Sequence, residues 1–589
     1  MKSRSPYLVT KALKTFMWGS ILAAVSSQIA TTTDAIVVSN LIGPAAISAI
    51  NLMTPILTLF SCLMIFFGIG ASIQAAKAIG RRDEKGAHGI FTASILSAAA
   101  SGIILALIVF IFSPFIAGLL TGGDEVIYAY ALSYLQVMCV CVPFLMMAGV
   151  VENFVKTDGN PRIVMIAVLS GGVMNLVLDI VFVKFLDMGI AGSAWATGIN
   201  YLVATLICMW HFKNPTSSLK WYVDTKMVGT YVRQSVAQGL PMGLNTLLLS
   251  GCIMALNAIV LMILGATGIY CWSVCVQLFL ILQMVLAGVG SSIYTMGGVL
   301  VGEQDMRGYS FLTVKTILIA CGALGAITVL ILIFPGFFGE LFGSRSDDPN
   351  VILHLALRAF SIMFVPYAFV ALLRSDYQIL GRIRLSLFLS VAQLLFMVGF
   401  VWGFALLNDK LLWWGFPSSS GALSICLIIY SFFERRKNPD LEPITLIPRY
   451  EDKEALNISV KMDSESVANA DRQVADFLKS QNLDQTTIYD VRLSCEELMH
   501  NIVNHAVARH PEKHFFDLHI RVGKNEVSVL LKDDGRPFNP VITGENLNVN
   551  PENMDSKIGL KIVNLACRDI NYKYMYDQNM VMLKFPFAN

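Results

Sequence analysis

The chain has 589 residues, of which 55% are hydrophobic and only 14% are charged, and its mean hydropathy is +0.63. Because average soluble proteins carry about 25% charged residues, this apolar excess excludes a purely cytosolic enzyme, a disordered protein, a coiled coil and a disulfide scaffold. The formal net charge of +2 hides an uneven distribution. Residues 1–437 contain 26 Lys and Arg against 18 Asp and Glu, whereas residues 438–589 contain 17 against 23. Two differently built regions therefore share the chain.

The first 437 residues contain the apolar runs expected of membrane-spanning helices, each of which needs about 20 mostly apolar residues. No cleavable signal peptide is expected, because the first apolar stretch is too long. Twelve runs are predicted, at residues 15–41, 47–76, 90–119, 126–150, 162–183, 189–211, 236–263, 267–299, 312–337, 351–376, 385–407 and 411–433. The sequence therefore predicts a polytopic α-helical membrane protein.

Basic residues are concentrated in every second loop between these runs. The N-terminus, the loops after the even-numbered runs and the exit at Arg435-Arg436-Lys437 carry most of the Lys and Arg, whereas the other loops carry few. Cytoplasmic loops of membrane proteins are enriched in Lys and Arg. We therefore expect a cell-membrane protein with both termini, and all of residues 438–589, in the cytoplasm.

The two halves of the membrane region resemble each other. Three matches recur at an offset of 222 residues: Gly80–Gly86 with Gly302–Gly308, Gly159 with Gly381, and Gly43 with Gly265. Repeats of this kind are typical of secondary transporters, in which the substrate path lies between the halves. We expect two six-helix lobes, at residues 1–224 and 225–437.

Two acidic residues fall inside predicted membrane helices. Asp34 follows three threonines in the first run, and Asp179 lies in the fifth run, four residues after Asn175. Residues at i and i+4 share one helix face, so Asn175 and Asp179 can both approach one cation. Ionisable groups deep in a bilayer cost several kcal/mol and are functional candidates. Their oxygen atoms suit Na⁺ or a carried proton, and the alternative is that they only bond neighbouring helices.

These residues and their neighbours resemble the multidrug and toxic compound extrusion (MATE) family. The resemblance covers about residues 10–435 and implies a V-shaped pair of six-helix lobes that exports small organic compounds in exchange for Na⁺ or H⁺. The matching segments are Asp34, Gly80–Asp83, Thr157–Arg162, Asn175–Asp179, Gly189–Thr197 and Gly239–Pro241.

The resemblance also implies which residues couple the cation. Family members with a cation site in the first lobe use residues that match Asp34, Asn175, Asp179 and Thr197 here. Some relatives also use an acidic residue soon after the Gly-Leu-Pro motif, where this chain has Asn245–Ser250 with no acid. The resemblance therefore supports a cation site in the first lobe only.

A different pattern follows the last apolar run. Residues 438–454 form a polar linker, and residues 455–589 have the mixed periodicity of an α+β domain. The predicted elements are strands at 455–462, 515–522, 526–531, 570–576 and 579–585, helices at 466–480, 486–508 and 559–568, and a loop at 541–557.

The second predicted helix of this domain carries a row of polar residues. Glu497, Asn501 and His505 are spaced by four and line one helix face. A carboxylate and an amide oxygen on one face can hold Mg²⁺ and orient a hydroxyl group or a water molecule. Taken alone, a solvated helix face explains the row equally well.

A second motif, Asp533-x-Gly535, follows an apolar strand. A buried Asp at this place can accept a hydrogen bond from an adenine amino group, and Gly535 lets the backbone approach the base. Gly559 is predicted at a helix start, where free N–H groups bind phosphate. Taken alone, the first of these motifs is usually only a turn.

In this order and spacing the motifs resemble the GHKL (Bergerat-type) ATPase domain, in the small form found in anti-sigma factor serine kinases, over about residues 455–586. The resemblance implies ATP and Mg²⁺, with Glu497 as general base, Asn501 as Mg²⁺ ligand, Asp533 and Gly535 at the adenine, and Gly559 at phosphate. Two departures are the short Lys557–Leu560 stretch, which replaces a glycine-rich one, and Pro537 in place of the usual glycine.

We therefore expect a cation-coupled exporter fused to a cytosolic ATP-binding domain, which regulates transport or phosphorylates a protein on Ser or Thr. A phosphoacceptor would be a cytosolic partner of the anti-sigma antagonist type. Besides its export substrate, the protein is expected to contact membrane lipids and no nucleic acid. Two alternatives are a membrane-bound signalling kinase, whose transporter-like part senses a ligand or ion, and a flippase for lipid-linked substrates of the same superfamily.

Overall fold

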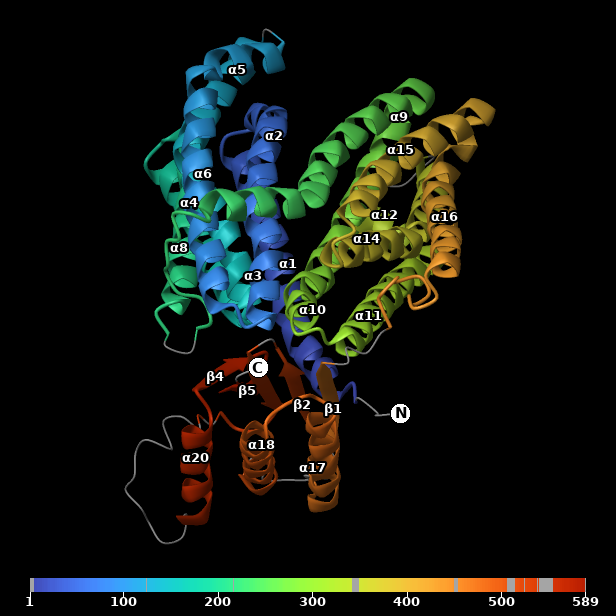
Figure 1. The fold of residues 1–589 in the computed structure, drawn as a ribbon. Coiled ribbons are helices and arrows are strands. Elements are labelled where there is room, and N and C mark those ends of the chain that lie inside the picture. The colour runs from blue at the N-terminus through green and yellow to red at the C-terminus, as the bar shows by residue number, and fades with distance from the viewer. Residues whose placement is uncertain are drawn as a thin grey trace.

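The structure, a computed structural model, describes residues 5–122, 124–214, 217–341, 349–449, 454–505, 514–523, 525–537, 539 and 554–587. Figure 1 shows two helical lobes that diverge at one end and meet at the other, where a small sheet lies against them. The start of the chain and the C-terminal domain lie at that same end (Figure 1). We call α1–α8 the first lobe and α9–α16 the second lobe.

The first lobe consists of long apolar helices with two short π-helical segments. Its elements are α1 (Tyr7–Leu41), α2 (Pro44–Ile65), η1 (Phe66–Gly70), α3 (Ala71–Gly80), α4 (Glu84–Ile111), α5 (Ser113–Thr121), α6 (Glu125–Thr157), α7 (Pro161–Asp179), η2 (Ile180–Phe185) and α8 (Gly189–His211).

The second lobe begins with the longest element of the described chain. Its elements are α9 (Val228–Ser292), η3 (Ile293–Gly297), α10 (Gly298–Gly302), α11 (Met306–Ile333), α12 (Pro335–Leu341), α13 (Pro349–Ile362), α14 (Phe364–Ile379), α15 (Ile383–Leu407), η4 (Asp409–Trp414) and α16 (Gly415–Lys437).

In the described residues, eleven helical spans are long and apolar enough to cross a membrane. The sequence predicted twelve runs, and the difference arises in α9. Gly265 has φ 62° and ψ −151°, so it bends this element sharply between the predicted runs 236–263 and 267–299. A positive φ favours glycine, and the bend lets one continuous element supply two membrane passages. The predicted fold of membrane helices in two lobes is confirmed.

The internal repeat is visible in the backbone geometry. Asp83 caps α4 by accepting a hydrogen bond from the Gly86 N–H at 2.9 Å, and Asp305 caps α11 in the same way through Gly308, also at 2.9 Å. Gly159 and Gly381, at the same offset, have φ values of 85° and 80°. Equivalent positions in the two halves therefore adopt equivalent conformations.

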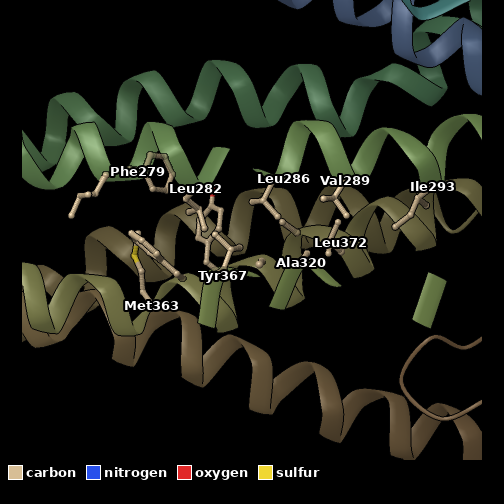
Figure 2. Close-up of a cluster of buried hydrophobic side chains, with 14 of the residues drawn as sticks. Phe279, Leu282, Leu286, Val289, Ile293, Ala320, Met363, Tyr367 and Leu372 are labelled. Atoms are coloured by element: carbon tan, nitrogen blue, oxygen red, sulfur yellow. The ribbon is translucent and has the colours of Figure 1, made fainter. Parts of the chain in front are cut away.

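The helices of the second lobe pack around a row of apolar side chains that begins in α9. Phe279, Leu282, Leu286, Val289 and Ile293 recur at alternating intervals of three and four, which places them on one helix face. Figure 2 shows this row against side chains from the neighbouring helices, among them Tyr367 and Leu372 of α14. All of these side chains are buried.

The two lobes touch closely where they meet. A Cβ atom at Gly80 would collide with the carbonyl oxygen of Val299, and one at Gly302 would collide with the carbonyl oxygen of Lys77. Gly70 lies equally close to the backbone of Ser235. Glycine at these three places lets the backbone of η1 approach α9 and that of α3 approach α10, so this end of the V is closed.

The C-terminal domain contains a five-stranded antiparallel sheet with strand order β1-β2-β3-β5-β4. Its strands are β1 (Ala455–Lys461), β2 (Phe515–Val522), β3 (Glu526–Asp533), β4 (Asp569–Met575) and β5 (Gln578–Pro586). The helices α17 (Ser464–Lys479), α18 (Gln485–His505) and α20 (Met554–Ala566) lie on the side away from the lobes (Figure 1). The predicted α+β domain is confirmed.

The two faces of this sheet have different neighbours. Leu518, Leu531 and Val581 lie opposite one another in register and belong to the core beneath the helices. On the next rung, Leu530 and its partner Met582 pack instead with residues of the lobes. The sheet is therefore sandwiched between its own helices and the closed end of the V.

Candidate functional sites

A polar cluster lies between α1, α7 and α8 inside the first lobe. Ser193 Oγ donates a hydrogen bond to Asp34 Oδ1 at 3.2 Å, and Asn175 Nδ2 donates one to Thr197 Oγ1 at 3.5 Å. The carboxyl groups of Asp34 and Asp179 are close enough to interact electrostatically. The structure thus brings together all four predicted coupling residues. It adds Ser193, which lies four residues before Thr197 on the same helix face and was missed as an ordinary small residue.

The two carboxyl groups of this cluster are poorly compensated. Asp179 is fully buried, and neither of its oxygens accepts a hydrogen bond from any residue that the structure describes. Two neighbouring carboxylates cannot both stay charged in such a place unless a cation balances them. Without a cation, one of the two must hold a proton. Asp179 is also the last residue of α7 before η2, and π-helical segments are frequent at functional sites. The chemistry of the cluster suits reversible binding of H⁺ or a hard cation.

The second lobe has a different arrangement. Asn257 of α9 accepts a hydrogen bond from Trp272 Nε1 at 2.5 Å. Asn245 accepts one from Arg374 Nη1, also at 2.5 Å. Arg374, which is 5% exposed, and the fully buried Asp376 of α14 were missed in the sequence, although two ionisable residues in an apolar run are a usable sign. A fixed guanidinium beside Asn245 repels cations, in keeping with a cation site in the first lobe only.

In the C-terminal domain, Glu497 and Asn501 of α18 face α20. A Cβ atom at Gly559 would collide with Oε2 of Glu497, so any larger residue there would displace the Glu497 carboxylate. Asn501 Nδ2 is buried and has no hydrogen-bond partner among the described residues. The His505 side chain lies outside what the structure describes.

The prediction that Gly559 stands at a helix start is wrong. The helix α20 begins at Met554, so Gly559 is its sixth residue. No Pro or Gly interrupts residues 554–558, and Asp555 near the N-terminus favours helix initiation. The predicted loop at 541–557 lies mostly outside the described residues.

Asp533 ends β3 and is 5% exposed. Its Oδ1 atom accepts hydrogen bonds from the Gly535 N–H at 2.8 Å and from Asn579 Nδ2 at 2.9 Å. Burial raises the pKa of this carboxyl group. Asn579 was missed in the sequence, because its proximity to Asp533 depends on the pairing of β3 with β5. The two bonds fix the carboxyl group at the end of the strand.

The sheet forms ion pairs with both lobes. Lys532 Nζ lies 2.6 Å from Glu303 in the loop before α11, and both side chains are less than 10% exposed. Lys573 Nζ lies 3.3 Å from Glu84 at the start of α4, and Asn571 Nδ2 donates a hydrogen bond to the same carboxylate at 2.6 Å. One sheet face therefore bridges the closed ends of the first and second lobes.

The first helix of the chain also contacts the C-terminal domain. Lys11 Nζ lies 2.6 Å from Asp534 Oδ2, and Tyr7 donates its hydroxyl proton to the same oxygen at 2.7 Å. His514 Nδ1 lies 2.9 Å from this oxygen as well. Although burial opposes it, the Lys11 and Tyr7 contacts lower the pKa of Asp534, so this ion pair is charged at neutral pH. Asp534 directly follows Asp533, and α1 carries Asp34 farther along.

Comparison with known families gives two matches, one to the membrane region and one to the C-terminal domain. The MatE family matches residues 20–181 and 241–404, which correspond to the two halves of the membrane region. The family described as "Histidine kinase-like ATPase domain" matches residues 460–585.

Individual relatives agree with the first match. Multidrug export protein MepA of Staphylococcus haemolyticus is 24% identical over 366 residues, which cover 59% of this chain and 76% of that protein. MepA of Staphylococcus aureus strain MSSA476 is 31% identical over 166 residues, which cover 28% of this chain and 37% of that protein.

Solved structures of the same fold include a MOP superfamily transporter from Pyrococcus furiosus, with a TM-score of 0.66 and 21% identity. A mutant of the Vibrio cholerae MATE transporter VcmN gives a TM-score of 0.68 and 19% identity. Each comparison covers 74% of this chain and 98% of the other one.

Proposed function

The chain belongs to the MatE family and carries a histidine kinase-like ATPase domain, and on this premise we propose that it exports small organic compounds in exchange for Na⁺ or H⁺ under the control of that domain. The relatives that are named multidrug export proteins support the substrate class. The observation that supports the coupling is the pair of carboxyl groups formed by the half-buried Asp34 and the fully buried Asp179. The alternating Lys and Arg content of the loops supports a cytoplasmic position for both termini and the ATPase domain.

The Asp34–Asp179 pair would couple export to an ion gradient through its charge. When the pair holds one proton or one Na⁺, its net charge falls from −2 to −1 and the repulsion is relieved; when it is empty, two carboxylates repel each other at low dielectric. The two states favour different packing of α1 against α7 and α8. Rocking of two lobes around a central site is the usual motion of such transporters, so binding of the ion can drive the change of access.

The coupling ion can be identified with the purified protein in liposomes. We expect efflux of a fluorescent organic cation to follow an imposed H⁺ or Na⁺ gradient, and to stop when that gradient is dissipated by an ionophore. Efflux that proceeds equally with no gradient of either ion would contradict the antiport mechanism.

The ATPase domain has side chains that fit a magnesium nucleotide. Asn501 is a partly buried amide whose nitrogen lacks a partner among the described residues, and an amide oxygen is a ligand that Mg²⁺ accepts. Asp533 is a buried carboxyl group that the Gly535 and Asn579 contacts hold in one orientation, as required for an adenine amino group. ATP, when bound, supplies a transferable phosphoryl group. Glu497 would accept the proton of the attacking hydroxyl group or water.

The contacts of the sheet suggest how the domain controls transport. Lys532 is paired with Glu303 in the second lobe, and Lys573 with Glu84 in the first. If the lobes rock apart at this end, one of these pairs must break or the sheet must move. The domain therefore acts as a clamp. The strength of its two ion pairs with the lobes sets how readily the closed end opens.

A short path connects the proposed nucleotide site to α1. Asp533 would contact the base, and the next residue, Asp534, holds Tyr7 and Lys11 of α1. The same 35-residue helix carries Asp34. A shift of β3 on nucleotide binding would thus act on the helix that contributes to the ion site.

A further inference from the structure

A cavity of about 170 Å³ lies between the C-terminal sheet and the closed end of the V. Its wall comes from three parts of the chain: the α3–α4 loop of the first lobe, Glu303 of the second lobe, and the sheet face that is turned away from α17, α18 and α20. This volume is large enough for several water molecules or one small ion. It lies on the opposite face of the sheet from the proposed nucleotide site.

The wall of this cavity is strongly basic. It contains four cationic side chains, Arg81, Arg82, Arg521 and Lys584. Within the part of the chain that the structure describes, none of the four forms an ion pair. Arg81 is exposed, and Arg82, Arg521 and Lys584 are half-buried. Holding several half-buried cations together without counter-charges is costly, which points to an anion.

Two carboxylates also line the cavity but do not cancel this charge. Glu303 is already neutralised by Lys532 of β3 at 2.6 Å. Glu526 is the other carboxylate of the wall, so the four cations outnumber the two lining carboxylates, and one of those two is shared with Lys532.

The strand register aligns two of the four cationic residues of the cavity. Arg521 of β2 lies directly opposite Ser528 of β3, and Ser528 lies opposite Lys584 of β5. The three residues occupy one rung of the sheet and share one face. They present a guanidinium group, a hydroxyl group and an ammonium group side by side, which are all donors that a phosphate oxygen accepts.

Arg82 faces this rung from the first lobe. Its φ of 65° is the left-handed conformation, which is uncommon for a non-glycine residue. Its Nη1 atom is buried without a hydrogen-bond partner among the described residues. Burial lowers the pKa of its guanidinium group to about 10, although Glu303 opposes this lowering, so Arg82 keeps its charge at neutral pH.

We propose that this cavity binds a ligand that carries phosphate groups. Arginine forks bind phosphate oxygens in pairs, and the excess of cations over carboxylates in the wall matches a multivalent anion better than a single carboxylate. The bound ligand would join the first lobe to the sheet, beside the Glu303–Lys532 pair that joins the sheet to the second lobe. It would therefore stabilise the closed end independently of any nucleotide at Asn501.

The test uses the full-length chain in nanodiscs of phosphatidylcholine, with thermal unfolding measured at constant ionic strength while inorganic pyrophosphate is titrated. We expect pyrophosphate to raise the melting temperature of the wild type, and Arg521→Gln to weaken its apparent affinity about tenfold or more. Arg472→Gln is the matched control, because Arg472 is exposed on α17 away from the cavity. Lys584→Gln is a second cavity variant, should Arg521→Gln fail to fold.

Two further arms identify the source and the place of binding. Nanodiscs of phosphatidylglycerol without pyrophosphate test whether a lipid headgroup is the ligand. A higher melting temperature in these nanodiscs for the wild type, but not for Arg521→Gln, supports the proposal. Stabilisation by pyrophosphate alone supports a soluble ligand. An Asn501→Ala variant is expected to keep the response, since it changes only the nucleotide site. Loss of the response in Asn501→Ala together with its retention in Arg521→Gln, or no response in either arm, would overturn the proposal.

Discussion

Replacing Asp34 with Asn is expected to reduce gradient-driven efflux to the background of protein-free liposomes. The amide has nearly the same shape as the carboxyl group, so the bond from Ser193 at 3.2 Å can persist. It carries no exchangeable charge, however, and it leaves Asp179 as the one carboxylate of the cluster. Binding and release of the ion then no longer switch the carboxylate pair between a relieved and a mutually repulsive state. The measurement is the initial rate of substrate efflux under an imposed ion gradient.

The matched control for this substitution is Asp187→Asn. Asp187 is exposed in the turn after η2, and its φ of 51° is a conformation that Asn adopts readily. This variant is expected to transport at the wild-type rate. Gradient-driven efflux that survives in Asp34→Asn would remove Asp34 from the coupling mechanism.

Replacing Lys532 with Glu is expected to release the ATPase domain from the second lobe. The substitution places two carboxylates face to face in a contact where both side chains are less than 10% exposed. Removing one partner of a buried ion pair lowers the stability of a protein by about 3–5 kcal/mol. We therefore expect a lower melting temperature and faster proteolytic cleavage between the last membrane helix and the domain.

The reversed pair tests whether this effect comes from the contact itself. The double variant Lys532→Glu with Glu303→Lys is expected to recover most of the lost stability, because the opposite charges are restored in exchanged positions. Lys479→Glu, on the exposed end of α17, is expected to behave like the wild type. If the double variant is as unstable as the sum of the single variants, the two side chains do not pair across the interface.

Local sequence patterns predicted much of the fold. The strand at Phe515–Val522 was predicted with the same bounds that the structure has, because an alternating apolar pattern between turn residues is a strong local signal. The bend at Gly265 falls between the predicted runs 236–263 and 267–299, because the positive φ there favours glycine, which also marks the break between the runs. Helix starts were harder, and α20 begins five residues earlier than predicted because no strong breaker precedes Gly559.

The candidate sites were only partly predictable. Asp34, Asn175 and Asp179 stand out because charged and amide side chains are rare in apolar helices. Ser193 and Asn579 do not stand out, since each acquires its role only when distant segments pack together. The docking of the sheet on both lobes is equally invisible in the sequence. The Glu303–Lys532 pair joins residues 229 positions apart, and no local periodicity records such a contact.

The central claim is that the nucleotide state of the C-terminal domain controls an ion-coupled exporter, and the rate of gradient-driven efflux with and without Mg-ATP tests it most directly. The protein is reconstituted with its ATPase domain accessible to added nucleotide, and Asn501→Ala is compared with Asn504→Ala, an exposed neighbour on α18. We predict that saturating Mg-ATP changes the efflux rate of the wild type and of Asn504→Ala severalfold and leaves Asn501→Ala unchanged. An efflux rate that is the same with and without Mg-ATP in the wild type would contradict the account.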